Sequence, residues 1–357
     1  MRRGNAPTLQ DVAREAGVSA MAVSVVLNGA RSATRVSDAT RVRIEEAAAR
    51  LSYRPNAAAR GMKRRRMDTI GVVAVVNGYL LDVLGGILEA ASARGQNTTV
   101  FSVSDWQADE RRILGFCDGR VDGVVLAGPH LTPDFAATLG RHAPFVAVHP
   151  AELHAHVWRV DVDNAGGAYA VVRHLIALGH RRIAHLAGPL RQAGARERLD
   201  GYRRALAGED IPYDERLVAE AFFTSHDGRT ATARLLDAVA AEQVPPFTAV
   251  FCANDASAVG CLEALAERGL RVPEDVSVAG FDDAFLARMT IPQLTTARQP
   301  FGELGRRAVE MLLAQIEANA APSDVSRTEV VGAELVVRAS TAPPLSSSPR
   351  SDSSEFP

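Results

Sequence analysis

Residues 8–62 constrain the fold more than any other stretch, and they begin TLQDVAREAGVSAMAVSVVLNG. Thr8, with Asp11 three positions later, forms a capping-box pattern that predicts a helix over residues 9–16, with Leu9, Val12, Ala13 and Ala16 on one face. Gly17 supplies a tight turn, and Ser19 precedes a second predicted helix over 20–27 that ends at Asn28-Gly29. Two short helices joined by a short turn with a glycine constitute a helix-turn-helix.

A third helix completes a small all-α head. Ser37 is expected to open this helix, which runs to residue 51 with Val42, Ile44, Ala48 and Leu51 as its apolar positions. Of the chain's 40 Lys and Arg and 42 Asp and Glu, residues 1–66 hold 14 and 5. A basic head on an acidic body predicts contact with a polyanion such as DNA at this end. The alternative is a small helical cap with a solvated basic face.

The order of residues in the head also resembles a known family. T-L-Q-D-V-A-R-E-A-G-V-S is followed by V-S-x-V-L-N-G and by R-x-R-I-E-x-A-A-x-x-L-S-Y-R-P-N-A-x-A-R, as in LacI/GalR (lactose-repressor type) transcription regulators. Further similarity reaches about Ser340. The resemblance implies a cytoplasmic homodimer that binds double-stranded operator DNA, acts as a repressor, and changes its operator affinity when a small polar effector, a sugar, binds the core.

The DNA-contacting residues are expected mainly on the second helix, whose first turn should enter the major groove. Its outward positions are Ala20, Met21 and Val25. Family members often carry larger polar residues at these positions, and the last of them is usually arginine. Arginine readout of guanine is therefore absent at Val25, and thymine methyl contacts are expected instead. Val25 as an ordinary core residue is the alternative. Backbone or minor-groove contacts are expected from Thr8, Ser19, Ser24, Asn28, Tyr53, Asn56, Ala59 and Arg60.

A hinge is expected between the head and the core. Residues 1–55 are assigned to the DNA-binding domain and 56–69 to a hinge helix and linker. A segment as short as 56–62 cannot hold a helix alone in water, so we expect it to fold only against DNA and a second subunit. In the family a leucine near the hinge's end wedges into the minor groove; Met62 takes that place, and an unbranched apolar side chain can also unstack a base step. A plain basic linker is the alternative.

Beyond residue 70, apolar runs alternate with amphipathic stretches. Strands are predicted over 70–76, 98–103, 121–126, 145–149, 182–186, 249–252, 276–280 and 294–298. Helices are predicted over 81–94, 164–178, 195–207, 229–240 and 256–268. Such alternation is typical of parallel sheets with helices on both faces, and roughly ten strands favour two lobes over one sheet.

The resemblance also implies how the lobes are connected. The core, residues 70–340, is expected to be an α/β periplasmic-binding-protein-like unit of two doubly wound parallel-sheet lobes. Lobe 1 is assigned to about 70–160 plus 292–320, and lobe 2 to about 161–291 plus 321–340, with the chain crossing near Asp161 and Pro292. Residues 341–357, rich in Ser and Pro, are expected to form a disordered tail.

Ligands of doubly wound sheets bind beyond the carboxyl ends of the strands. Polar and aromatic residues suited to sugar hydroxyls and ring faces lie there or match effector positions of the family: Asn77, Tyr79, His149, Arg196, Phe223, Asn254 and Asp282. His149-Pro150 and Asn77-Gly78-Tyr79 depart from the usual family residues, so the ligand is expected to be an unusual one. Alternatives are helix capping by Asn254 and Asp282, a surface ion pair for Arg196 and a structural role for His149.

Other classes of protein find little support in the sequence. Apolar runs such as 70–76 are too short to span a bilayer, and no apolar h-region follows Met1-Arg2-Arg3, so neither a membrane segment nor a signal peptide is expected. Cys117, Cys252 and Cys261 lack zinc or redox spacing and are expected to be buried thiols. Nucleophile-elbow, phosphate-loop and zinc-protease motifs are absent from the sequence, so we expect no enzyme, metal or cofactor. Remaining alternatives are a solute-binding protein, a sugar-processing enzyme, and a regulator with a ligand-free dimerisation core.

Overall fold

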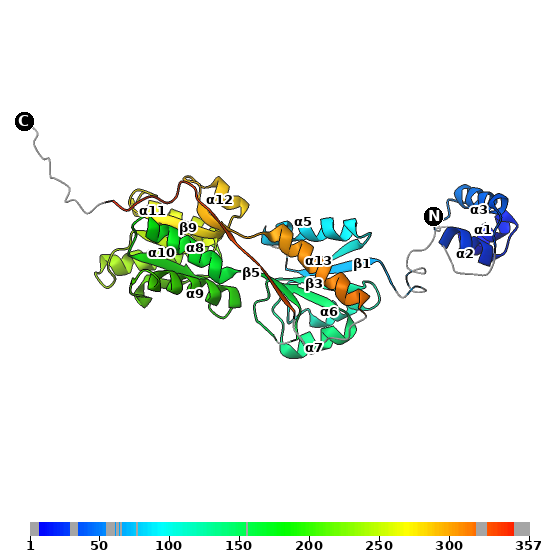
Figure 1. Cartoon of the computed structure of the whole chain (residues 1–357), viewed down its shortest axis with the longest axis horizontal. Helices are drawn as coiled ribbons and strands as arrows, with labels where there is room; N and C mark the ends of the chain where they lie inside the picture. The colour runs from blue at the N-terminus through cyan, green and yellow to red at the C-terminus, as the bar shows by residue number, and fades with distance from the viewer. Residues whose placement is uncertain are drawn as a thin grey trace, which may run out of the picture. The chain divides into compact units, whose positions relative to one another are not determined.

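The computed structural model describes residues 7–28, 35–54, 61, 64, 66–75, 78–154, 156–318 and 327–345. The chain divides into two compact units, which are described separately. One comprises residues 1–69 with 118–122, and the other holds the remaining residues. The first contains the helical head, drawn in blue in Figure 1.

The head consists of α1 (Leu9–Ala16), α2 (Ala20–Asn28) and α3 (Asp38–Arg50), as the sequence predicts. The capping box is present, because the Thr8 hydroxyl accepts from the Asp11 amide and the Asp11 carboxylate accepts from the Thr8 amide. Gly17 turns the chain with φ 63° and ψ 41°, a conformation that glycine adopts without strain. The Ser19 hydroxyl oxygen accepts from the Ala22 amide at 3.1 Å and starts α2.

One apolar position of α3 is wrong in the sequence prediction. Val42 is exposed, whereas Ile44, Ala47 and Ala48 are buried against α1 and α2. The buried stripe follows the helical spacing of three and four residues from Ile44 to Leu51. Val42 lies outside that stripe.

The core contains two six-stranded sheets. The first has the order β11-β5-β4-β3-β1-β2 and the second β12-β10-β9-β8-β6-β7. In the first sheet the strands are β1 (Thr69–Ala74), β2 (Asn97–Ser102), β3 (Gly123–Ala127), β4 (Phe145–Val148), β5 (Arg159–Val162) and β11 (Thr328–Val331). In the second they are β6 (Ile183–Ala187), β7 (Val218–Glu220), β8 (Ala249–Cys252), β9 (Ser277–Asp282), β10 (Thr295–Arg298) and β12 (Glu334–Val336). The pairs β1–β3, β3–β4, β6–β8 and β8–β9 are parallel, and β12 runs antiparallel to β10.

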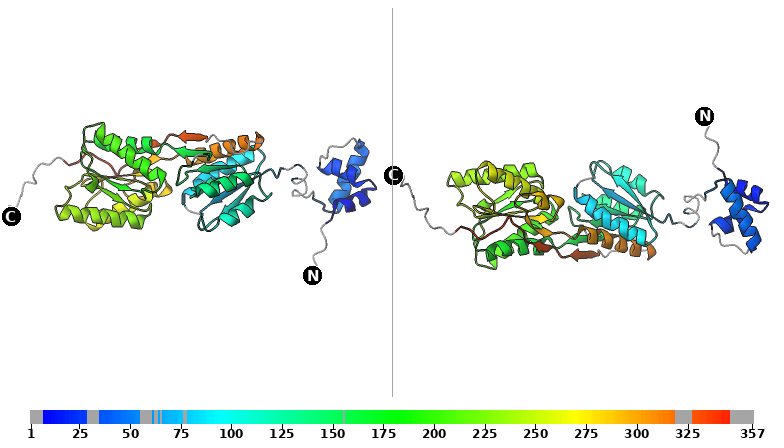
Figure 2. Two further views of the ribbon diagram at one scale, coloured as in Figure 1. Left: turned by 90° about the horizontal axis from the view of Figure 1, so that it is seen from below. Right: turned by 90° about the horizontal axis from the view of Figure 1, so that it is seen from above.

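Helices cover both faces of the sheets, as Figure 2 shows from two sides. The helices of the first lobe are α5 (Gly78–Ala93), α6 (Glu110–Cys117), α7 (Pro133–His142) and α13 (Phe301–Glu317). Those of the second lobe are α8 (Asn164–Ala177), α9 (Ala193–Ala207), α10 (Ser225–Ala240), α11 (Asp255–Glu267) and α12 (Phe285–Met289). A 3-10 turn, η1 (Glu215–Leu217), precedes β7. The central strands β3, β4, β6 and β8 are buried throughout, because helices exclude water from both of their faces.

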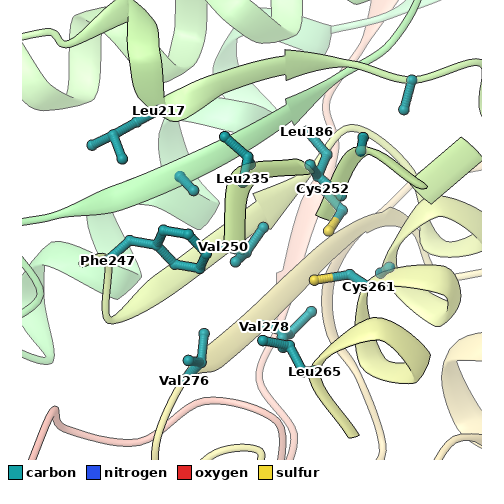
Figure 3. Packing of buried hydrophobic residues seen from close by; sticks show 14 of the residues in the cluster. Leu186, Leu217, Leu235, Phe247, Val250, Cys252, Cys261, Leu265, Val276 and Val278 are labelled. Carbon is teal, nitrogen blue, oxygen red and sulfur yellow. The ribbon is translucent and has the colours of Figure 1, made fainter. Parts of the chain in front are cut away.

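The apolar cores explain which helix covers which face. On one side of the second sheet, α8 and α9 pack against Phe251 and Phe281. On the other side, α10 and α11 pack against Val250, Cys252 and Val278. Figure 3 shows this second cluster, in which the sulfur atoms of Cys252 and Cys261 face each other. Burial raises the pKa of the Cys252 thiol. All three cysteines are buried and outside any disulfide, so the prediction of buried thiols is confirmed.

The chain crosses between the two sheets three times, which corrects the expected lobe boundaries. Residues 294–298 were expected in lobe 1, but β10 pairs with β9 in the second sheet. The return to the first lobe follows β10 and leads into α13, which packs on β3, β4 and β5. Strand β5 (Arg159–Val162) belongs to the first sheet, so the expected break near Asp161 falls inside this strand, and β11 and β12 divide between the two sheets. Local residue patterns identify a strand but not its partner, so these boundaries could not be read from the sequence.

The C-terminal segment is ordered further than expected. The Ala342 amide donates to the Ser277 hydroxyl oxygen at 3.0 Å, and the Ala342 carbonyl oxygen lies 2.9 Å from a ring nitrogen of the buried His180. The prediction of disorder is therefore wrong for residues 341–345, because polar side chains of the second lobe hold this segment. Residues 346–357 lie outside the described part of the chain.

Candidate functional site

Helix α2 has some side chains exposed and others buried in the head core. Ala20 and Met21 are exposed, Met21 by 51%, while Ala22 and Val23 are buried in the head core. Val25 is half-buried and is not among the residues that pack on that core, which include its neighbours Val26 and Leu27. The alternative role of Val25 as a core residue is therefore disfavoured. Ser24 and Asn28 are half-buried on the same helix.

The other candidate DNA-contacting residues fall into two groups. Thr8 and Ser19 are exposed at the starts of α1 and α2, where unpaired backbone amides favour anions such as phosphate. Tyr53 is half-buried and packs against the head core. Asn56, Ala59, Arg60 and Met62 lie outside the described residues, and so does most of the expected hinge helix.

The core unit contains a cavity of about 770 Å³. It lies where strands of both sheets end, and several helices begin there. Four of the predicted effector residues line it: His149, Phe223, Asn254 and Asp282. Asn77 lies outside the described residues, and Tyr79 falls in the first turn of α5, where only the backbone is described. The rule that ligands bind beyond strand ends thus located this cavity.

Arg196 is not part of the cavity, and this prediction is wrong. Its guanidinium donates to the carbonyl oxygens of Leu190 and Arg191 on the surface. Arg198, two residues later on α9, lines the cavity and is only 7% exposed. The sequence did contain a signal for Arg198, because it continues the buried helical stripe of Ala195, Leu199 and Tyr202. Arg196 is on the opposite side of the helix.

Arg198 is held from several directions. Its Nε donates to Asn164 Oδ1 at 2.9 Å, and its Nη1 donates to the Ala253 carbonyl oxygen at 2.5 Å. The guanidinium carbon lies 3.9 Å from the centre of the Phe281 ring, a cation–π distance. Burial lowers the pKa of Arg198, and the nearby carboxylates, Asp282 foremost, oppose this shift. The result is a fixed cation at the wall of the cavity.

Asp282 stands opposite this cation. Arg198 Nη1 and Asp282 Oδ1 are 3.8 Å apart, and Gln299 Nε2 donates to the same oxygen at 2.6 Å. Burial nevertheless raises the pKa of Asp282, with Arg198 and Gln299 partly opposing it. A carboxyl group in this environment gains from any further hydrogen-bond donor that a ligand supplies.

Asn254 both caps a helix and lines the cavity. Its Oδ1 accepts from the Ser257 amide at 2.9 Å, which starts α11, and its Nδ2 donates to the Phe223 carbonyl oxygen at 3.2 Å. Phe223 itself has φ 49°, a conformation unusual for a phenylalanine. The capping interpretation of Asn254 is thus correct without removing the residue from the cavity.

His149 directly follows β4, and its ring contacts two residues of the same lobe. Its Nδ1 donates to Asp161 Oδ1 at 2.8 Å, and its ring lies edge-on to Phe301 with centroids 6.2 Å apart. Asp161, which we did not single out from the sequence, also accepts from the Val162 amide at 2.9 Å. His149 and Asp161 both line the cavity, and the hydrogen bond between them fixes them relative to each other.

Several further lining residues have weak or absent sequence signals. Trp106 follows the polar turn after β2, and Asn164 starts α8 directly after β5. Gln299 belongs to the crossing between β10 and α13, and its place in the cavity depends on that connection. Within the described ranges, no group of three His, Cys, Asp or Glu side chains is placed to hold a metal ion.

Residues 8–56 match the family described as bacterial regulatory proteins of the lacI family, and residues 172–341 match the periplasmic binding protein-like domain. The HTH-type transcriptional regulator CelR of Thermobifida fusca is 37% identical over 327 residues, which cover 88% of this chain and 94% of that protein. A solved complex of the transcriptional regulator CelR with cellobiose is 34% identical with a TM-score of 0.70, and the lac repressor dimer bound to operator and the anti-inducer ONPF is 31% identical with a TM-score of 0.80. Each structural match covers 94% of this chain and 99% of the other.

None of the described helices is long and apolar enough to cross a membrane. The head, the two-lobed parallel-sheet core and the similarity over nearly the whole length agree with one another. The chain belongs to the LacI family of bacterial transcription regulators, and it is a DNA-binding regulator with a helix-turn-helix head and a periplasmic-binding-protein-like core.

Proposed function

We propose that this regulator is a homodimeric repressor whose operator affinity is set by a neutral sugar bound in the core cavity. The lining of the cavity carries the proposal. It combines fixed acceptors, Asp161 and Asp282, with a fixed donor, Arg198. A sugar hydroxyl both donates and accepts, so it can satisfy both kinds of partner at once.

The remaining lining supports a neutral ring rather than an anion. Phe223, Trp106 and Phe301 offer aromatic faces for the apolar face of a sugar. Three carboxylates line the cavity, those of Asp82, Asp161 and Asp282, against one guanidinium that already has protein partners. A phosphorylated ligand would meet more repulsion than attraction there. The cellobiose bound by CelR is a ligand of the favoured kind.

On the DNA side, we propose that Ala20, Met21 and Val25 contact thymine methyl groups in the major groove. Backbone and minor-groove contacts are assigned to Thr8, Ser19, Ser24, Asn28, Tyr53, Asn56, Ala59, Arg60 and Met62. Two heads of a dimer would read the two halves of a pseudo-palindromic operator, as symmetric helix-turn-helix proteins do. The operator-bound lac repressor dimer supports this arrangement.

The coupling between the two sites follows from linkage. A sugar that binds the core better when the operator is absent must weaken operator binding by the same factor. The sugar contacts residues of both lobes, so its binding energy depends on how the lobes are arranged.

The test begins with binding of the purified protein to fragmented DNA of its own genome, followed by sequencing of the retained fragments. We expect one enriched pseudo-palindrome. Its affinity is then measured with and without glucose, ribose and cellobiose, and with glucose 6-phosphate as the anionic control. Release by a neutral sugar but not by the phosphate supports the proposal. Salt-sensitive retention without a shared sequence motif, or operator binding that no sugar changes, contradicts it.

A further inference from the structure

The end of β9 has an unusual backbone. Asp282 and Asp283 are adjacent, and their φ angles are 127° and 55°. Non-glycine residues seldom adopt positive φ, and such strain persists only where the surrounding structure enforces it. Asp282 lines the cavity, so this corner determines where its carboxylate points.

Two arginines hold the second residue of the corner. Asp283 Oδ2 accepts from Arg298 Nε at 2.7 Å, and Asp283 Oδ1 accepts from Arg338 Nη2 at 2.5 Å. The Asp283 carboxylate is buried, which favours its neutral form, but the hydrogen bonds from both arginines outweigh burial and lower its pKa. The ion pair is thus charged at neutral pH, and such charge-assisted bonds are strong and directional.

Arg338 is itself fixed to the second lobe. Its Nη1 donates to the Leu294 carbonyl oxygen at 2.8 Å, and its backbone amide donates to Thr295 Oγ1 at 2.9 Å. Two residues later, the Ser340 hydroxyl donates to the Val278 carbonyl oxygen at 2.6 Å, on the strand that leads to the corner. The segment after β12 therefore lies beside β9, from Asp283 just beyond the end of the strand to Val278 near its start.

We propose that Arg338 is a positioning residue of the effector site, which holds Asp283 in its strained conformation and thereby keeps the Asp282 carboxylate turned into the cavity. Arg338 does not line the cavity and acts only through the corner. The inference rests on the proposed function for its consequence in sugar binding. Its structural part can be tested without any ligand.

The binding experiment compares Arg338→Met, Arg338→Lys and Arg271→Met in the full-length protein, with glucose, ribose and cellobiose as probes. Arg271 is the matched control, because it holds Asp275 through two similar bonds of 2.9 and 3.0 Å and lines no part of the cavity. We expect Arg338→Met to weaken binding of whichever sugar binds the wild type by roughly 10- to 100-fold, the worth of one charged hydrogen bond. Arg338→Lys should restore part of the affinity, and Arg271→Met should not change it.

A double-mutant cycle separates positioning from general destabilisation. In an Asp282→Asn background, Arg338→Met should have little further effect on sugar binding, because the residue through which it acts is already altered. An equal loss in both backgrounds, or wild-type affinity in Arg338→Met alone, overturns the proposal.

Crystal structures of wild type and Arg338→Met without ligand decide the structural part. We expect the variant to lose the positive φ angles at residues 282 and 283 and to turn the Asp282 carboxylate away from the cavity. An unchanged corner overturns the proposal whatever the sugars do. If no sugar binds the wild type, the proposed function fails, and the two crystal structures still decide whether Arg338 positions Asp282.

Discussion

At the scale of single residues, Arg198 lines the cavity, whereas Arg196, on the same helix, lies on the surface. Arg198→Met should abolish the sugar response, because it removes a buried donor and leaves Asn164 Oδ1 and the Ala253 carbonyl oxygen without it. It should also lower the free energy of unfolding by about 1–3 kcal/mol. Sugar binding by calorimetry and urea unfolding measure the two effects.

Arg196→Met is the matched control for that experiment. Its guanidinium bonds only carbonyl oxygens of a surface loop, so the variant should respond to sugar as the wild type does and change stability by less than about 0.5 kcal/mol. A normal response in Arg198→Met would contradict the assignment of that residue to the effector site.

His185 makes stability depend on pH. It is fully buried, stacks between Phe251 and Tyr202, and has its Nδ1 2.9 Å from the Phe251 carbonyl oxygen. Burial lowers its pKa from 6.5 to about 4. As the pH falls, the unfolded chain therefore binds the proton on His185 before the folded chain does. The contribution of neutral His185 to the free energy of unfolding is fully present above pH 6.5. It is lost between pH 6.5 and 4, by up to about 3 kcal/mol.

Urea unfolding at pH 7 and pH 4.5 measures this decline. His185→Phe keeps the stacking and cannot be protonated, so its loss of stability between the two pH values should be smaller than that of the wild type. His174 and His180, whose pKa values burial also lowers, would remain as a residual slope. An equal decline in both proteins would show that folding does not lower the pKa of His185.

At the scale of elements, the turn between α1 and α2 depends on Gly17. Its φ is 63°, and a Cβ added there would meet nothing within 4 Å. Gly17→Ala should therefore destabilise the head through backbone strain alone, by roughly 1–2 kcal/mol. Gly115→Ala, in the open interior of α6, should have the opposite sign, because alanine favours helix by about 0.5–1 kcal/mol. Hydrogen exchange of α1 and α6 reports each effect separately.

The elements that sequence reasoning missed have a common physical character. Strands with continuous apolar runs, such as β8, were predicted to the residue. The missed strands β5, β7, β11 and β12 are three or four residues long and contain charged residues. Three of them, β7, β11 and β12, are edge strands with half-exposed faces. Without a buried face, alternation of apolar residues gives no signal.

The same limit applies to the candidate site, where residues that follow central strands were predictable from the sequence. His149, Asn254 and Asp282 follow central strands, so the strand-end rule located them. The buried stripe of α9 indicates Arg198 as a lining residue, although the effector site was predicted to contain Arg196 instead. Trp106 follows β2, and nothing in the residue pattern singles it out as a lining residue. Gln299 was not recoverable, because its place in the cavity depends on how the two lobes are connected. Local patterns do not contain that connection.

At the scale of the whole molecule, one short stretch of the second lobe exposes several large apolar side chains. Phe285 is 68% exposed, Met289 62% and Ile291 97%. Such a cluster is typical of an interface, and the proposed homodimer offers a second copy as its partner. Ile291→Asp should weaken dimerisation and, with it, operator binding by two heads.

Sedimentation velocity and operator titration at matched protein concentrations measure the two effects. Leu153→Asp is the control, since Leu153 is also exposed but lies in the loop that follows β4 of the first lobe. If Ile291→Asp sediments as a dimer at the same concentrations as the wild type, the subunits associate through another surface.

The three crossings between the sheets also limit how this protein can be rebuilt by recombination. Neither lobe is encoded by one continuous stretch of the gene. The chain passes from the first lobe to the second after β5, returns after β10, and passes to the second lobe again between β11 and β12. A chimaera made by exchanging one continuous stretch with a relative would therefore combine segments of both proteins within a lobe. A stop codon after α13 would remove an outer strand from both sheets at once, so a short loss at the end of the gene damages both halves of the ligand-binding unit.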